Sequence, residues 1–130
     1  MKKIIILVFL LVAFQLFSQI IELPYYTDDE QIINHTGYTL KYNEQYEQAE
    51  LVAYQLTNKE VGGKYPRSDN FRQDPHISTG SATLSDYKGS GYDRGHLIPA
   101  ADMKWSPDAM NVSFYMSNMS PQNPGFKRGI

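Results

Sequence analysis

The sequence contains no cysteine and only one tryptophan among its 130 residues. The absence of cysteine excludes disulfide bonds, zinc sites built from thiolates and a lipid anchor on a thiol. No internal repeat or low-complexity tract is present, and the length predicts one domain at most. A G-x-S-x-G sequence is also missing, because neither Gly89-Ser90-Gly91 nor Gly80-Ser81 extends into one. This argues against a serine hydrolase of the nucleophile-elbow type.

Long apolar runs are also missing, except at the N-terminus. Met1-Lys2-Lys3 precedes an almost wholly apolar stretch from Ile4 to Phe17. A charged start followed by a short apolar segment is typical of a secretory signal peptide, and this segment is too short to span a bilayer as a stable helix. We therefore expect a signal peptide over residues 1–18, a mature chain that begins near Gln19, and a secreted or periplasmic protein without a stable membrane anchor.

The net charge gives no sign of a polyanionic partner, because it is −2 for the whole chain. Removal of the signal peptide takes away two lysines and no acid, which makes the balance more negative. The charges are unevenly spread, however. Between Gln19 and Thr57 seven acidic residues face the single Lys41, whereas from Asn58 onward nine basic residues face seven acidic ones. The second part is therefore mildly basic, which suits phosphate contact without establishing it.

Two stretches have the composition of β-strands. Residues 38–42 and 51–57 are rich in β-forming side chains that partly alternate, and they predict two strands of a central antiparallel sheet. The polar residues 43–50 between them are typical of a turn, and Gly62-Gly63 ends the pattern. Residues 20–31 are acidic and lack periodicity, so we interpret them as a solvated leader.

Two arginines lie in an extended, charged segment that ends at Pro75. Arg67 and Arg72 could each bind a phosphate through paired guanidinium donors, or could simply be solvated. The other two histidines, His35 and His76, are interpreted as ordinary surface residues.

The stretch Asp93-Arg94-Gly95-His96 carries the strongest signal for chemistry. It should begin a strand over residues 93–100 that holds an imidazole at a solvent-reachable edge. An imidazole titrates near neutral pH, so His96 is the predicted general base that takes a proton from water. Arg94 keeps its proton, which leaves phosphate stabilisation or a structural ion pair as its role, with Asp93 as a structural partner. A purely structural histidine is the alternative on these four residues alone.

The residues that follow predict a second strand and a helix. Ser106-Pro107-Asp108 has the composition of a helix N-terminus, with serine as the N-cap and proline in the first turn. Residues 114–119 are expected to form the second strand. A turn and a helix that begins near Phe126 or Lys127 should follow.

These stretches together resemble one family. Asp93–His96, with Ser85–Gly91 before it and Ala101–Ser106, Phe114–Asn118 and Ser120–Gln122 after it, is similar to the endonuclease G-like DNA/RNA non-specific endonucleases. The resemblance implies an α+β fold in which an antiparallel β-sheet carries a ββα-metal (His-Me finger) motif. Residues 19–130 would then be the N-terminal part of a truncated nuclease domain, because the chain stops within the first turn of the expected helix.

The resemblance also implies a divalent cation, Mg²⁺ or another such as Mn²⁺. In the family an asparagine at the start of the helix contacts the ion, and a glutamate further along the helix supports its water shell. The asparagine position aligns with Lys127, whose ammonium group has no lone pair for a metal, and the glutamate would lie beyond Ile130. Asn118 and Asn123 are substitute ligands, since both offer amide oxygens.

Two hypotheses of different classes result. The first is an exported, metal-dependent endonuclease that hydrolyses DNA and RNA without sequence specificity, with His96 as general base and Arg67 or Arg72 in contact with the substrate. The alternative is a non-catalytic exported fragment or pseudoenzyme that at most binds nucleic acid. Lys127 and the early stop favour the alternative for this polypeptide, whereas residues 93–96 favour the first hypothesis for its family.

Overall fold

A computed structural model describes residues 31–128, except for the side chain of Lys127. The expected signal peptide and most of the expected leader lie outside these residues. The described elements are, in chain order, β1 (Gln31–His35), β2 (Tyr38–Asn43), β3 (Gln48–Ala53), α2 (Leu84–Tyr87), β4 (Asp93–His96), η2 (Ala100–Met103), α3 (Pro107–Val112), η3 (Met116–Asn118), β5 (Met119–Gln122) and α4 (Pro124–Arg128). None of the described helices is long and apolar enough to cross a membrane.

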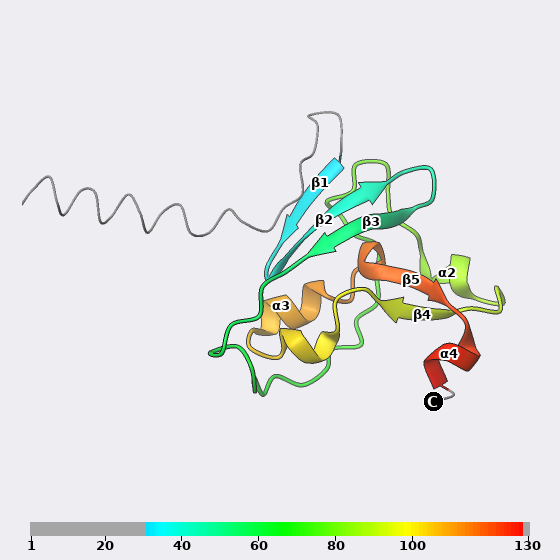
Figure 1. The fold of residues 1–130 in the computed structure, drawn as a ribbon. Helices are drawn as coiled ribbons and strands as arrows, with labels where there is room; N and C mark the ends of the chain where they lie inside the picture. The colour runs from blue at the N-terminus through cyan, green and yellow to red at the C-terminus, as the bar shows by residue number, and fades with distance from the viewer. Residues whose placement is uncertain (1–30, 129–130) are drawn as a thin grey trace, which may run out of the picture.

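The first sheet contains three antiparallel strands in the order β1-β2-β3 (Figure 1). Its central strand, β2, alternates between a buried and a partly exposed face, and Tyr38, Leu40 and Tyr42 point into the core. Alternation with period two is what places one face of a strand in the core. The buried face packs with Ile98, Met103 and other apolar residues that follow β4 in the chain. The strand expected over residues 38–42 is therefore confirmed.

The other expected strand begins and ends earlier than the sequence indicated. β3 starts at Gln48, within the stretch interpreted as a turn, and ends at Ala53. The reason is a short turn after β2, in which the Asn43 side chain accepts hydrogen bonds from the backbone N–H groups of Gln45 and Tyr46 at 3.0 and 3.3 Å. An asparagine that bonds to the backbone two residues on produces a tight turn. Pairing with β2 therefore resumes sooner than expected.

The second sheet is formed by β4 and β5, which are antiparallel and pair Gly95 with Ser120 and His96 with Met119. β4 stops at His96 and does not reach residue 100, because the η2 helix begins directly after Pro99. The second strand expected over residues 114–119 is also wrong in position. Residues 116–118 form η3, whose first backbone N–H donates to the Arg72 carbonyl at 2.8 Å, and β5 follows from Met119.

Two helix starts depend on side-chain caps. Ser106 caps α3 as expected, since its hydroxyl accepts a hydrogen bond from the Ala109 N–H at 3.3 Å. α4 begins at Pro124, before the expected Phe126, because the Asn123 side chain accepts from the Gly125 N–H at 2.8 Å and proline is favoured in a first turn. The order β4, β5, α4 is the expected strand–strand–helix succession, and Figure 1 shows these three elements grouped on one side of the molecule.

Candidate active site

His96 is the last residue of β4, and Arg94 lies on the same face of this strand because residues two apart share a face. Both side chains contact Phe71, which comes from the long segment between β3 and α2. The Arg94 Cζ atom lies 4.4 Å from the centre of the Phe71 ring, and the rings of His96 and Phe71 are 5.8 Å apart. One aromatic ring therefore positions both residues that the sequence selected as catalytic.

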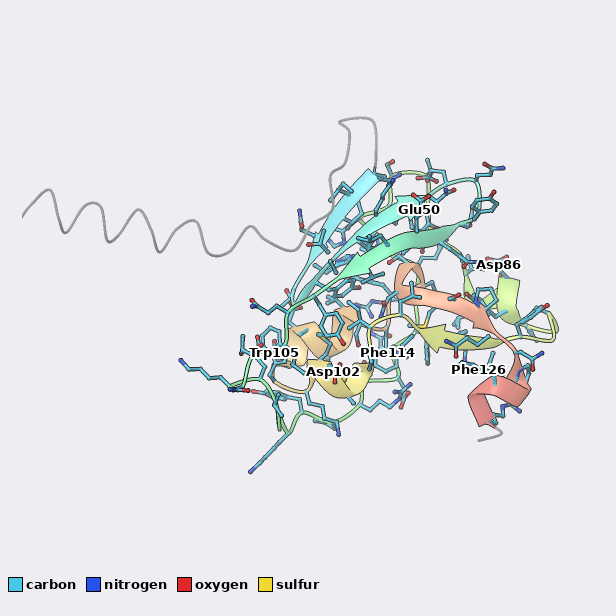
Figure 2. The ribbon with its side chains drawn as sticks, in the orientation of Figure 1. Glu50, Asp86, Asp102, Trp105, Phe114 and Phe126 are labelled. Atoms are coloured by element: carbon cyan, nitrogen blue, oxygen red, sulfur yellow. The ribbon has the colours of Figure 1, made fainter. Side chains whose placement is uncertain are left out.

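A second ring completes this arrangement. Phe114 is fully buried, and its ring centre lies 4.8 Å from that of His96 and 4.9 Å from that of Phe71. Figure 2 shows Phe114 toward the middle of the molecule, whereas the exposed Phe126 lies at its edge on α4. The Arg67 Cζ atom lies 4.7 Å from the Phe114 ring centre. We call this group the His96 cluster, and it consists of Arg67, Phe71, Arg94, His96 and Phe114.

The two candidate substrate arginines are separated by the fold. Arg67 joins the His96 cluster, whereas Arg72 lies over Tyr115, with its Cζ atom 4.1 Å from the ring centre. Arg72 Nη1 also donates to the carbonyl oxygens of Asn70 and Asn111 at 2.9 and 3.1 Å. These contacts attach the segment before Pro75 to the C-terminal end of α3. Arg67 Nε in turn donates to Asp69 Oδ1 at 2.6 Å, so both arginines have protein partners, and Arg67 is the one that lies in the His96 cluster.

Asp93 forms the expected structural ion pair, but with a residue of α4. Arg128 Nε donates to Asp93 Oδ2 at 2.7 Å, and Arg128 Nη2 contacts the other carboxylate oxygen. The hydrogen bonds that Arg128 donates to this carboxylate raise the pKa of Arg128. The pair connects α4 to the strand that carries His96.

An open hollow lies beside the His96 cluster. It has a volume of about 650 Å³, and its lining includes Phe71, Tyr87, Lys88, Tyr92, Arg94 and Arg128. We call it the cationic hollow, because its described lining has three basic side chains and one acidic side chain, Asp93. Lys88, Tyr87 and Tyr92 were not selected from the sequence. Their position directly before Asp93–His96 was the available signal, since neighbours of a motif often line the same cavity.

The candidate metal ligands are occupied by structural hydrogen bonds. Asn118 is fully buried, and its Oδ1 accepts from the Ile98 N–H at 3.0 Å while its Nδ2 donates to the Ser113 carbonyl at 2.8 Å. Asn123 caps α4, and the side chain of Lys127 lies outside the described residues. Around His96 the described residues thus provide arginines, aromatic rings and the engaged carboxylate of Asp93. Mg²⁺ usually keeps several of its waters and binds through one or two carboxylates, and the carboxylate present here, Asp93, is already paired with Arg128.

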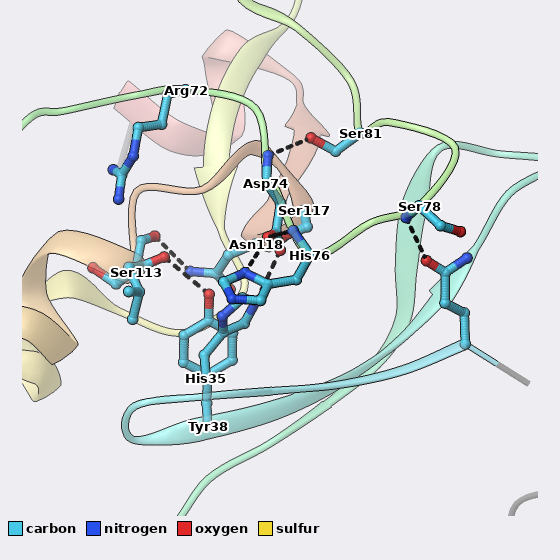
Figure 3. A network of polar contacts seen from close by, with 12 residues as sticks. His35, Tyr38, Arg72, Asp74, His76, Ser78, Ser81, Ser113, Ser117 and Asn118 are labelled. Atoms are coloured by element: carbon cyan, nitrogen blue, oxygen red, sulfur yellow. Dashed lines mark hydrogen bonds and ion pairs between the residues drawn. The ribbon is translucent and has the colours of Figure 1, made fainter.

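His35 corrects an expectation, because it is a buried residue and not a surface one. Its side chain is 1% exposed, and its Nε2 lies 2.8 Å from Asp74 Oδ2. His76 is 54% exposed, as a surface residue should be, yet its Nδ1 lies 3.0 Å from Asp74 Oδ1 (Figure 3). β1 was absent from the sequence expectations, and it is the strand that brings His35 to this place.

Asp74 is the centre of that group. Burial by itself would raise its pKa, but hydrogen bonds from His35, Ser117 and the backbone N–H of His76 outweigh burial and lower the pKa to about 2. The ligand atoms of His35, Asp74 and His76 lie within 4.8 Å of one another. Two nitrogens and one oxygen are a ligand set for transition metals. Each of these atoms already takes part in a hydrogen bond, however, so the group is complete as a structural network.

This network reaches the segment that follows His96. The Ser117 hydroxyl donates to Asp74 Oδ2 at 2.6 Å. The next residue, Asn118, accepts from the backbone N–H groups of Leu97 and Ile98 at 2.9 and 3.0 Å. Buried hydrogen bonds thus fix the chain directly after the histidine.

Comparison with known proteins finds similarity to nucleases. A family model described as DNA/RNA non-specific endonuclease matches residues 18–130. Nuclease 1, a mitochondrial protein of Schizosaccharomyces pombe, is 42% identical over 105 residues, and human mitochondrial endonuclease G is 40% identical over 96 residues. The matches cover 76% and 72% of this chain, but 32% of each relative. The chain therefore spans about a third of the length of these curated relatives.

A solved structure has the same fold. The crystal structure of an EndoG/EndoGI complex, described as showing the mechanism of EndoG inhibition, matches with a TM-score of 0.71 and 31% identity. The match covers 79% of this chain and 44% of that one. The expected α+β fold is thus confirmed.

Proposed function

Because the chain belongs to the DNA/RNA non-specific endonuclease family, we propose that it hydrolyses phosphodiester bonds of DNA and RNA without sequence specificity. One observation carries this proposal: Arg67, Arg94 and His96 converge on the Phe71–Phe114 ring pair at the edge of the cationic hollow. Phosphodiester hydrolysis uses a general base and positive charge near the phosphate, and these three side chains can provide both.

His96 has the role of general base. Hydrolysis requires a hydroxide in line with the leaving oxygen and positive charge to offset what develops on the phosphoryl oxygens. An imidazole can take a proton from water at neutral pH, although the Nε2 atom of His96 is buried and does not lie at the solvent-reachable edge expected from the sequence.

Arg94 and Arg67 have the role of phosphate binding. Each guanidinium group lies over an aromatic ring, which occupies the face of its plane, whereas a phosphate binds at its edge. Ring contact and phosphate contact can therefore coexist. Phosphate contacts carry no direct information about bases, so a site of this kind accepts many sequences and both sugars.

The proposal includes Mg²⁺, or another divalent cation such as Mn²⁺, as the resemblance implies. Such an ion would stabilise charge on the phosphoryl oxygens. With the Asp93 carboxylate paired to Arg128, such an ion would keep most of its waters, and the roles given above belong to side chains alone. Export through an N-terminal signal peptide is a further part of the proposal, supported by the charged start and the apolar residues 4–17.

The alternative is a protein that binds nucleic acid without cutting it. The observation that favours it is the ligand set around His96, in which Asn118 and Asn123 are engaged elsewhere. The same cationic hollow would serve binding in either case.

Digestion of plasmid DNA and of RNA, with Mg²⁺ and with EDTA, tests the proposal. We expect Mg²⁺-dependent cutting of both substrates and a loss of about 10²- to 10⁴-fold in rate for His96→Ala, as is usual when a general base is removed. Asn58→Ala is the control, since Asn58 is an exposed residue outside the His96 cluster and the cationic hollow, and it should cut at nearly the original rate. Full activity of His96→Ala would contradict the assignment. Binding without any cutting by the unmodified chain would favour the alternative.

A further inference from the structure

A second hollow adjoins the cationic hollow, and the two share lining residues. Its volume is about 350 Å³, and its lining includes Tyr46, Glu47, Asp86, Tyr87, Ser90 and Tyr92. Tyr87 and Tyr92 also line the cationic hollow. These two tyrosines therefore form the boundary between two cavities of different character. We call the second cavity the tyrosine hollow.

The two cavities differ in charge. The cationic hollow has Lys88, Arg94 and Arg128 in its wall, whereas the described lining of the tyrosine hollow has two carboxylates, Glu47 and Asp86, and no basic side chain. A phosphate group is attracted to the first and repelled by the second. Aromatic ring faces at the boundary instead suit a planar, uncharged group, and a nucleobase next to a bound phosphate is such a group.

The tyrosines are presented by a well-defined turn. The Ser90 hydroxyl donates to the Tyr87 carbonyl at 2.9 Å and accepts from the Tyr92 N–H at 3.1 Å. Gly89 and Gly91, on either side of Ser90, have φ angles of 76° and 84°, which favour glycine. Tyr92 is 54% exposed although it is a large aromatic residue. The turn thus holds an exposed ring at the boundary without covering it.

We propose that Tyr87 and Tyr92 form a stacking subsite for an unpaired nucleobase, next to a backbone phosphate held in the cationic hollow. This inference rests on the proposed function, since it takes the ligand to be a nucleic-acid strand. It adds that the strand must expose a base to reach the tyrosine hollow. Single strands therefore bind better than duplexes at this site. Every base offers a ring face, so the subsite has no strong base preference.

Fluorescence anisotropy in EDTA, which prevents metal-dependent cutting, tests the proposal with two labelled oligodeoxynucleotides of equal length and charge. One is an ordinary single strand, and the other is abasic at every internal position. The unmodified chain should bind the ordinary strand more tightly. Tyr92→Ala should weaken binding of the ordinary strand about five- to hundredfold, as is usual for loss of one base–aromatic stack, and leave binding of the abasic strand within about twofold. Tyr92→Phe keeps the ring and should retain affinity.

Two control variants separate stacking from other effects. Tyr65→Ala removes an exposed tyrosine that lines neither hollow and should change neither affinity. Lys88→Ala should weaken both oligonucleotides alike and reduce the salt dependence of binding, because it removes a phosphate contact.

Three outcomes would overturn the proposal. Equal affinity of the unmodified chain for both strands would exclude a base subsite while leaving the proposed function intact. Equal weakening of both strands by Tyr92→Ala would show that Tyr92 acts on charge or fold. Absence of binding to either strand would contradict the proposed function itself, together with the subsite.

Discussion

Phe71 and Phe114 hold an imidazole and two guanidinium groups through ring contacts, at residues that lie far apart in the chain. His96 touches both rings, Arg94 touches one and Arg67 the other. An aromatic pair of this kind is a rigid support, since each ring has few rotamers and both pack against neighbours. The positions of the proposed catalytic and phosphate-binding side chains thus depend on two apolar residues that have no reactive group.

At this scale some positions have a local sequence signal and others do not. His96 and Arg94 could be selected because they lie in one short motif. The choice between Arg67 and Arg72 could not be made, because it depends on which ring each guanidinium group meets after folding. His35 was misjudged for a similar reason: its partner, Asp74, lies 39 residues away in the chain.

Asp74 provides a prediction about pH. Its pKa of about 2 lies below that of a carboxyl group in an unfolded chain. The ionised carboxylate therefore stabilises the fold by about 2 kcal/mol above about pH 4. This stabilisation is lost as the pH falls toward 2. Asp74→Asn should reduce the free energy of unfolding at pH 7 by about 3 kcal/mol and flatten its dependence on acid. Urea unfolding at pH 7, 4 and 2.5 measures both.

Asp69→Asn is the matched control, since the Asp69 side chain is 62% exposed and asparagine tolerates its φ of 49°. It should change stability by at most about 0.5 kcal/mol at each pH. The same acid dependence in Asp74→Asn as in the unmodified protein would contradict the central place of Asp74.

At the scale of elements, the function depends on β4, β5 and α4 and on the long segment between β3 and α2, which contains Arg67 and Phe71. Asp93–Arg128 connects α4 to β4, and the Arg72–Tyr115 backbone pairing brings Phe71 and Phe114 together. α3 and β2 could be predicted locally, because an N-cap sequence and an alternating strand carry their own signals. β5 could not, since residues 116–118 bond to the Arg72 segment and this displaces the strand toward the C-terminus. Hydrogen bonds to a segment far away in the chain have no signature in the local sequence.

Gly63 lies where the segment between β3 and α2 passes close to the backbone of Lys104. A Cβ atom at Gly63 would lie 2.2 Å from the carbonyl carbon and oxygen of Lys104, which belong to the backbone and cannot rotate away. Gly63→Ala should therefore reduce the free energy of unfolding by about 1–3 kcal/mol, as overpacking usually does. Denaturant unfolding measures the change. The exposed neighbour Val61 is the control, and Val61→Ala should have little effect. Unchanged stability of Gly63→Ala would contradict this close approach.

At the scale of the whole molecule, charge and shape are divided between regions. The three-stranded sheet covers the core and holds His35, while β4 and β5 lie beside it (Figure 1). The His96 cluster and the cationic hollow involve β4, whereas the tyrosine hollow lies between the β4–β5 region and the β2–β3 turn. A net charge of −2 therefore says little about binding, because the local balance at the cationic hollow is positive. The overall fold class and the family could be read from the motif, whereas the two adjoining hollows depend on the full three-dimensional arrangement.

A nucleic-acid strand is expected to bind where Arg67, Arg94 and His96 converge. Titration of the ¹⁵N-labelled protein with a short single-stranded oligonucleotide in EDTA, followed by amide chemical shifts, measures where the strand binds. The largest shifts are expected at Phe71 and over residues 87–96, with small changes at Asp74 and His76 in the structural network. Shifts centred on β1 and β3, with residues 87–96 unmoved, would contradict this expectation.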